Sequence, residues 1–186
     1  MNVIEAIHSR RSIKRFEAQP PTREQIETLL SVAVLAPNHR NTEPWRFYVL
    51  GPEARYAYGL ALGERRARKL EDAGKAREVR DRTAAEHRAL PCMIAVAMTS
   101  SDNPETREED YAAIMMGVQN LALAAVELGL GTHIRTGAVM DDPAARAATG
   151  VASGERIVAM IHLGTPLEIP PGRPRTPAEA HTVWMP

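Results

Sequence analysis

The spacing of apolar residues predicts two helices near the amino end of the chain. Residues 2–9 place three apolar side chains at helical spacing, namely Val3, Ile4 and Ile7. A second helix is expected to begin after Thr22, because Thr22 and Gln25 have the spacing of a capping box. Pro37 ends it, since proline cannot continue a helix.

Short apolar runs predict the strands. Residues 46–50 form a run that Gly51 and Pro52 end, and residues 93–98 form a second run that is apolar throughout. Two further runs, residues 132–135 and 156–163, lie in the second half of the chain. We therefore expect three or four strands.

The strongest helix signal covers residues 104–130. Its interior is apolar nearly all round, which is typical of a helix at the centre of a fold or in a subunit interface. Residues 53–89 are also expected to be helical, with a break near Gly74 and only a narrow buried face, and residues 142–149 predict a short helix. Together these elements indicate an α+β fold built around a long apolar helix.

Length and composition limit the class of protein. The 186 residues suffice for one domain with a sizeable core, and we expect residues 1–186 to form it. Residues 170–186 are expected to be an extended tail, because prolines crowd the segment between Pro166 and Pro177. A formal net charge of zero argues against a general nucleic-acid or anionic membrane surface. The single cysteine, Cys92, indicates a cytoplasmic protein without an intrachain disulfide.

Two polar clusters carry the candidate chemistry. Residues 10–16 contain four cations and a hydroxyl, which suit the oxygens of a phosphate. Residues 36–45 contain turn formers, amides, an imidazole and a Pro-Trp pair, which suit the rim of a pocket for a flat heteroaromatic ring. The two clusters together suggest a phosphorylated planar cofactor.

Four ordered motifs resemble those of the nitroreductase family, in particular its short bacterial branch. They are Arg-Arg-Ser-x-Lys-x-Phe at residues 10–16, Ala-Pro-x-x-x-Asn-x-Glu-Pro-Trp at 36–45, Gly-Leu-Gly-Thr with Arg-Thr-Gly at 129–137, and Leu-Gly-x-Pro at 163–166. The chain departs from the pattern at Glu43, where the family has Gln, and in the tail beyond Pro170. A carboxylate at position 43 would need a proton or a cation, for which Arg40 and Arg46 are candidates.

The resemblance implies a fold, a cofactor and an activity. The fold would be nitroreductase-like, with a mostly antiparallel sheet flanked by helices in an interlocked homodimer that binds two FMN molecules at its interface. The activity would be FMN-dependent oxidation of NADH or NADPH, with hydride passed in a ping-pong cycle to a nitroaromatic, a quinone or a similar electron-poor acceptor. No side chain is expected to act as a catalytic acid or base.

The resemblance also implies which residues bind FMN at its polar end. Arg10, Arg11 and Ser12 would hold the phosphate and the chain that leads to the ring. Lys14 would lie near the pyrimidine end of the ring, although Arg15 is an equal rival for that position.

Two further segments are implied to approach the ring. On the loop after the second helix these are His39, which the partner subunit could supply, Asn41, and the main chain near Leu35. After the third predicted strand they are Ile134, Arg135, Thr136 and Gly137. A main-chain N–H of this second segment could donate to the ring, and Arg135 has pairing with the phosphate as an alternative role.

Two other hypotheses stay open at this point. The same contacts would serve a non-enzymatic FMN carrier or sensor. A basic interaction module without a cofactor would instead use residues 10–15 with Arg173 and Arg175 as an anion-binding patch. The six histidines have no metal-ligand spacing, so no metal site is predicted. Residues 53–89 are expected to cover the active site.

Overall fold

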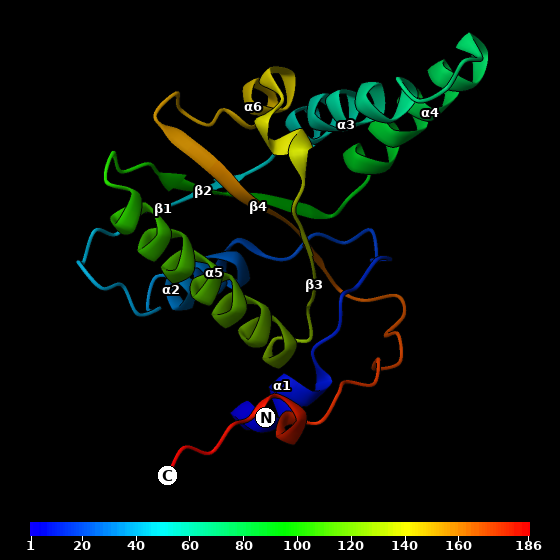
Figure 1. The fold of residues 1–186 in the computed structure, drawn as a ribbon. Coiled ribbons are helices and arrows are strands. Elements are labelled where there is room, and N and C mark those ends of the chain that lie inside the picture. Colours follow the sequence, from blue (N-terminus) through cyan, green and yellow to red (C-terminus); the bar gives the residue numbers. More distant parts are fainter.

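A four-stranded antiparallel sheet forms the centre of the protein, whose computed structural model describes residues 1–186 (Figure 1). Its strands are β1 (Trp45–Val49), β2 (Cys92–Thr99), β3 (Gly131–Arg135) and β4 (Glu155–Gly164), in the order β1-β2-β4-β3. Every pair of neighbours is antiparallel. The predicted α+β class and four strands are confirmed.

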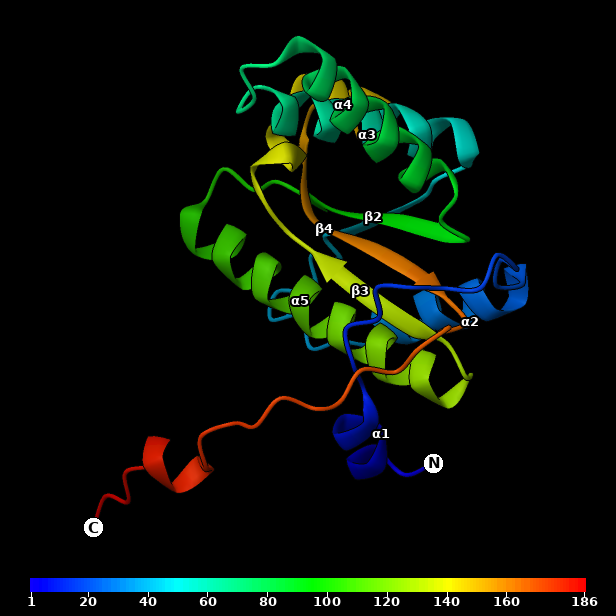
Figure 2. The same ribbon diagram turned by 90° about the vertical axis from the view of Figure 1, so that its right-hand side faces the viewer.

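Helices cover both faces of this sheet (Figure 2). They are α1 (Val3–Ser9), α2 (Arg23–Ala33), α3 (Pro52–Ala67), α4 (Ala73–Arg88), α5 (Pro104–Glu127) and α6 (Pro143–Thr149), with 3-10 turns η1 (Ala138–Asp141) and η2 (Ala178–His181). Helices α2 and α5 lie on one face, and α3, α4 and α6 lie on the other. The helical break expected near Gly74 lies between the end of α3 at Ala67 and the start of α4 at Ala73. Asp72 fixes the start of α4, because its side chain accepts a hydrogen bond from the N–H of Lys75.

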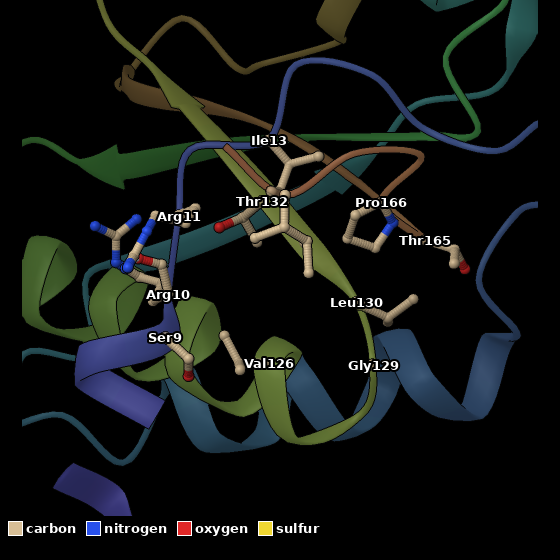
Figure 3. Close-up of a pocket in the computed structure, with 12 residues that line it drawn as sticks. Ser9, Arg10, Arg11, Ile13, Val126, Gly129, Leu130, Thr132, Thr165 and Pro166 are labelled. Carbon is tan, nitrogen blue, oxygen red and sulfur yellow. The ribbon is translucent and has the colours of Figure 1, made fainter. Parts of the chain in front are cut away.

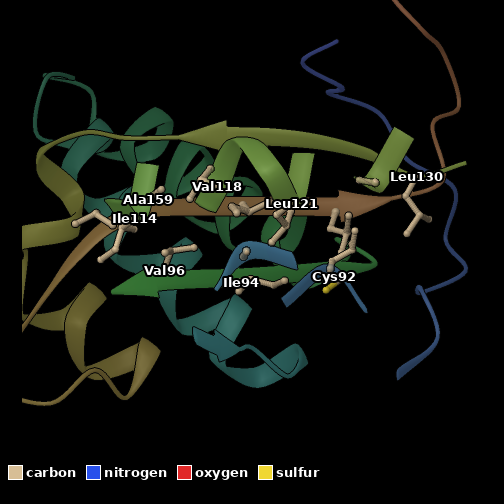
Figure 4. Close-up of a cluster of buried hydrophobic side chains, with 14 of the residues drawn as sticks. Cys92, Ile94, Val96, Ile114, Val118, Leu121, Leu130 and Ala159 are labelled. Atoms are coloured by element: carbon tan, nitrogen blue, oxygen red, sulfur yellow. The ribbon is translucent and has the colours of Figure 1, made fainter. Parts of the chain in front are cut away.

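Strand alternation divides the core into two clusters. Along β2, Ile94 and Val96 face α5 (Figure 4), while Met93 and Ala95 face α3 and α6. Because both faces of β2 are covered, residues 92–98 are buried without interruption. This explains why the sequence shows an apolar run there rather than alternation.

Two glycines permit the closest helix contacts. A Cβ at Gly117 of α5 would lie 2.6 Å from the carbonyl oxygen of Ala33 in α2. A Cβ at Gly59 of α3 would lie 2.8 Å from the Cα of Ala84 in α4. Any larger side chain at either position would push the two helices apart.

The predicted helix ends are also found. Thr22 and Gln25 form the capping box of α2, and Pro143 occupies the first turn of α6. After α5 the chain turns at Gly129, whose φ of 70° is in the left-handed region that glycine tolerates best. This turn leads the chain directly into β3.

The segment that follows α1 joins the free edge of β3. Ser12 pairs with Thr132 in a parallel bridge, and the N–H of Ile13 donates to the carbonyl oxygen of Thr132 at 2.9 Å. The tail leaves β4, and its end projects away from the sheet and the helices that cover it (Figure 2), so that residues 171–186 are all exposed. None of the helices is long and apolar enough to cross a membrane.

Candidate functional site

A pocket opens between the end of α1, the end of α5 and the start of β3 (Figure 3). We call it the α1–β3 pocket, and its volume is about 280 Å³. Its lining residues are Ser9, Arg10, Arg11, Ile13, Val126, Gly129, Leu130, Gly131, Thr132, Thr165, Pro166 and Ile169. The motif at residues 10–16 and the glycine-rich turn at 129–131 therefore meet at this pocket, although they are far apart in the sequence.

Residues 10–14 present a row of polar groups along this edge of the sheet. The segment is extended beside β3, so alternate side chains point in opposite directions. Ile13 points inward and is 3% exposed, which leaves Ser12 and Lys14 on the outer side together with Arg10. The side chains of Arg10, Ser12 and Lys14 make no hydrogen bond or ion pair within the chain, and we call them the edge row.

Arg11 differs from Arg10 in what it contacts. Its Nη1 donates to the carbonyl oxygen of His8 at 2.6 Å and to that of Arg10 at 2.9 Å, so Arg11 satisfies carbonyls at the end of α1. The tail also passes beside it, since a Cβ at Gly172 would lie 2.8 Å from Nη2 of Arg11. Both guanidinium groups lie at the same end of the pocket in Figure 3, but only that of Arg10 has all its donors free.

The two rivals for the ring position differ in their contacts within the chain. Arg15 lies 3.9 Å from the carboxylate of Glu168, and its carbonyl oxygen accepts from the N–H of Leu167. The ammonium group of Lys14 has no ion pair, and Lys14 is on the same side of its extended segment as Ser12.

The segment after β3 brings two unpaired main-chain donors to the other end of the edge row. The N–H groups of Thr136 and Gly137 make no hydrogen bond within the chain. Gly137 has a φ of 143°, and a Cβ there would meet nothing within 4 Å, so the space beside it is open. A planar ligand could therefore approach this backbone closely.

The side chains of Ile134 and Arg135 point to opposite faces of the sheet. Ile134 packs on the core beneath α5, so only its main chain is available to a ligand. Arg135 lines a second pocket against α3. Because Ser12 pairs with Thr132 in parallel, Arg10 lies five residue positions before Arg135 along β3. At 3.3 Å per residue, the two are separated by about 16 Å along the strand. The structure thus does not bring Arg135 to the end of the edge row that Arg10 occupies.

The loop at residues 36–45 is fixed to the first half of α5. Nδ1 of His39 lies 2.8 Å from Oε1 of Glu109, and Nε of Arg40 donates to Oε2 of the same carboxylate at 3.2 Å. The hydrogen bond from His39 is the largest cause of the lowered pKa of Glu109. Asn41 is exposed, with a φ of 49°, and Leu35 is 77% exposed.

This loop does not meet the edge row within one chain. Glu109, which holds His39, and Val126, which lines the α1–β3 pocket, are almost five helical turns apart on α5, or roughly 25 Å. The implied site residues therefore fall into two groups. One group is the edge row with residues 134–137, and the other is Leu35, His39 and Asn41.

The carboxylate of Glu43 is free, so the expected cation partner is absent. Arg40 pairs with Glu109 and Glu105, and Arg46 pairs with Glu155. Only main-chain groups of Glu43 are engaged, as its N–H donates to Oδ1 of Asn38 at 2.9 Å and its carbonyl oxygen accepts from Arg46. The Glu43 side chain is exposed, so water can solvate its carboxylate in place of a cation.

Three of the scattered histidines meet in the fold. The ring of His162 makes edge contacts with His87 at 5.6 Å and His133 at 5.7 Å between centroids, and His87 lies 5.9 Å from Tyr58. Nε2 of His87 and Nε2 of His162 are buried without a partner. Burial is the main cause that lowers the pKa of His162 to about 3. The structure has no group of three or more His, Cys, Asp or Glu side chains that could hold a metal ion.

The positions of these rings could not be read from their spacing. His87, His133 and His162 come from α4, β3 and β4, and only the strand register places His133 opposite His162. The strand register alone places His133 beside His162. The contact of His162 with His87 depends in addition on how α4 packs against the sheet.

These observations describe an α+β protein with a row of free donors along one sheet edge, which leads to unpaired main-chain N–H groups. The chain belongs to the nitroreductase family, whose family model matches residues 7–165. Among its relatives is YfhC of Bacillus subtilis (strain 168), which is provisionally named an NAD(P)H nitroreductase. The two are 32% identical over 174 residues, which cover 92% of this chain and 88% of YfhC.

Solved structures agree with this assignment. A nitroreductase-like family protein from Bacillus cereus superposes with a TM-score of 0.86 and 26% identity, covering 100% of this chain and 96% of that one. The FMN- and NADPH-dependent nitroreductase NfnB from Sphigopyxis sp. strain HMH superposes with a TM-score of 0.78 and 17% identity, covering 100% of both chains. The second likeness concerns the fold alone.

Proposed function

We propose that this protein is an FMN-dependent NAD(P)H oxidoreductase that reduces nitroaromatics, quinones or similar electron-poor acceptors. The observation that carries the proposal is the edge row of Arg10, Ser12 and Lys14, whose donors are all free, together with the free N–H groups of Thr136 and Gly137. The family and the cofactor dependence of NfnB support it.

The order of these groups along the sheet edge fits the parts of FMN. Arg10 would hold the phosphate by charge-assisted hydrogen bonds, with the unengaged nitrogens of Arg11 beside it. Ser12 would contact the ribityl chain. Lys14 and the main chain of residues 134–137 would lie along the ring, at the opposite end from Arg10.

FMN, when bound, takes up a hydride from the nicotinamide and delivers it to the acceptor. The protein contributes placement and electrostatics. The charge of Lys14 would stabilise negative charge at the pyrimidine end of the reduced ring, and the N–H groups of Thr136 and Gly137 would donate to the ring edge. Hydride transfer through the flavin requires no acid or base side chain, so we assign no catalytic residue.

A second copy of the chain would complete the site. Val3, Ile4 and Ile7 of α1 are 68%, 63% and 49% exposed, and Trp184 in the tail is 90% exposed, which is unusual for apolar side chains of a monomer. We propose that a homodimer buries them and that His39 and Asn41 reach the FMN site of the partner subunit. Light scattering on the eluting protein would then give twice the mass of one chain, and a monomer would contradict this arrangement.

We also propose a cytoplasmic location and small molecules as the partners. Burial raises the pKa of the one thiol, that of Cys92, to about 11, so this thiol stays protonated and unreactive. The zero net charge gives the protein no general attraction for nucleic acid.

Anaerobic mixing with NADH or NADPH tests the proposed activity. Purified protein loaded with FMN should lose its visible flavin absorbance after addition of the nicotinamide and regain it after addition of a nitroaromatic or a quinone. A flavin band that never bleaches would favour an FMN carrier or sensor. A protein that takes up no FMN would favour the basic interaction module and would end the proposal.

A further inference from the structure

The second pocket lies between α3 and the segment that follows β3, on the face of the sheet opposite α5. We call it the α3 pocket, and its volume is about 160 Å³. Its lining residues are Tyr58, Leu62, Arg65, Arg135, Thr136, Gly137, Ala138, Val139 and Met140. Three of these, residues 135–137, belong to the segment that the proposed function places along the flavin ring.

The charge in this pocket is uncompensated. Arg65 comes from α3 and Arg135 from the end of β3, and neither guanidinium makes an ion pair or a hydrogen bond within the chain. No lining residue is acidic. Some surface arginines face a carboxylate, as Arg40 faces Glu109 and Arg88 faces Glu53, but Arg65 and Arg135 face a pocket that has none. Two free guanidinium groups at one small pocket therefore point to an anion from outside the chain.

Tyr58 offers a third donor to this pocket. Its ring is buried, and its hydroxyl makes no hydrogen bond within the chain. The hydroxyl oxygen is not among the buried atoms that lack a partner, so it is open to the pocket and free to contact a ligand there. Burial raises the pKa of Tyr58 to about 12, so the hydroxyl stays protonated and can donate at neutral pH.

We propose that the α3 pocket is an oxyanion subsite that binds a carboxylate of the electron acceptor through Arg65, Arg135 and the Tyr58 hydroxyl. This inference rests on the proposed function, since it adds a substrate class to the same site. The volume suits one small anionic group, and paired guanidinium forks match the two oxygens of a carboxylate. An acceptor held there would lie directly beside residues 135–137.

A phosphate of NADPH has the same oxyanion chemistry, so the experiment has one arm for each source. The first arm compares kcat/KM for 4-nitrobenzoate with that for nitrobenzene, which lacks the carboxylate. The second compares NADPH with NADH against a neutral acceptor.

Arg65→Gln should lower the ratio of kcat/KM for 4-nitrobenzoate to kcat/KM for nitrobenzene by about tenfold or more, as expected for a lost charge-assisted contact. Arg68→Gln, which alters an exposed arginine outside the pocket, should leave this ratio unchanged.

A binding measurement keeps this inference separate from the proposed activity. In calorimetric titrations, benzoate should bind more tightly than neutral benzamide, and this preference should shrink in Arg65→Gln and in Tyr58→Phe. The second variant keeps the ring against His87, so it removes only the hydroxyl. A protein that shows the benzoate preference but never oxidises NAD(P)H would refute the activity and keep the subsite.

Two results would overturn the carboxylate assignment. The first is an Arg65→Gln variant with unchanged ratios in both kinetic arms and an unchanged preference for benzoate. The second is a changed NADPH to NADH ratio alone, which would assign the pocket to the nucleotide phosphate instead.

Discussion

The two faces of the central sheet differ in chemistry. The face toward α2 and α5 packs a cluster of fifteen buried residues, all of them apolar. The face toward α3, α4 and α6 also has an apolar cluster, but it adds the buried rings of His87 and His162, the free hydroxyl of Tyr58 and a pocket lined by two arginines. Two buried ring nitrogens without a partner, Nε2 of His87 and Nε2 of His162, lie on the second face, whereas the first face has one such atom, Oγ1 of Thr132, which lies opposite Leu163.

This difference shows where the fold can accept functional chemistry. Buried polar groups without partners destabilise a protein, and they persist where a ligand or a reaction needs them. The edge row runs along the free edge of β3, and its Lys14 end leads to residues 135–137, which line the α3 pocket. Variants on the two faces should therefore have effects of different kinds.

The largest effect is expected in the apolar face. Leu121 of α5 is fully buried, and Leu121→Ala should lower the free energy of unfolding by about 3 to 4 kcal/mol, because it leaves a cavity that the helix cannot close. Met116→Ala, on the exposed side of the same helix, should change it by less than about 1 kcal/mol. Equal losses in urea unfolding would mean that α5 is covered differently from what we describe.

The polar face should instead make stability depend on pH. In the unfolded chain a histidine takes up a proton near pH 6.5, whereas His162 stays neutral down to about pH 3. Between these values the unfolded state binds more protons, so stability falls as the pH falls. At pH 4.5 this effect of His162 should be about 2 to 3 kcal/mol.

His162→Phe should remove that dependence. The variant keeps a ring against His87 and His133, so its stability near pH 8 should be close to that of the wild type, while its loss on acidification should be smaller. His181→Phe in the exposed tail is the matched control and should leave the pH profile as it is. If the two variants have the same profile as the wild type, His162 is not held neutral by burial.

At the edge between the faces, the two neighbouring arginines should differ. Arg10→Ala should weaken FMN binding by about 2 kcal/mol, because all its donors are free for the phosphate. Arg11→Ala should weaken it less, since Arg11 already donates to carbonyls at the end of α1. Fluorescence titration of FMN measures both, and a larger loss for Arg11 would reverse our assignment.

The smallest effect is expected at Glu43. Its carboxylate has no partner in the chain and is exposed, so Glu43→Gln should change stability by less than about 0.5 kcal/mol. FMN binding should stay the same or tighten slightly. A large loss of affinity would show that this carboxylate has a role of its own.

The difference between the faces also decides what the sequence could predict. Apolar spacing and capping residues are local signals, so they indicated α2, α5 and all four strands within a few residues. The motif at residues 10–16 located the edge row, since its residues are adjacent in the chain. Spacing alone could not show that Arg11 donates to carbonyls at the end of α1, or that Arg15 faces Glu168 while Lys14 has no ion pair, because these contacts depend on how the chain folds.

Two of the three groups of the α3 pocket, Tyr58 and Arg65, gave no such signal, whereas Arg135 belongs to the Arg-Thr-Gly motif. Tyr58, Arg65 and Arg135 come from α3 and β3, and an isolated tyrosine or arginine in a helix is most often a surface or core residue. Their meeting depends on the order of the strands and on how α3 packs across the sheet. Neither is encoded at short range, so the α3 pocket could be found only in the folded chain.

A crystal structure of the protein grown with FMN would test the central claim most directly. We predict that the phosphate lies within hydrogen-bonding distance of Arg10, and that the ring lies between Lys14 and the main chain of residues 134–137. FMN bound away from the edge row, or a fully occupied crystal in which Arg10 touches no part of it, would contradict the account.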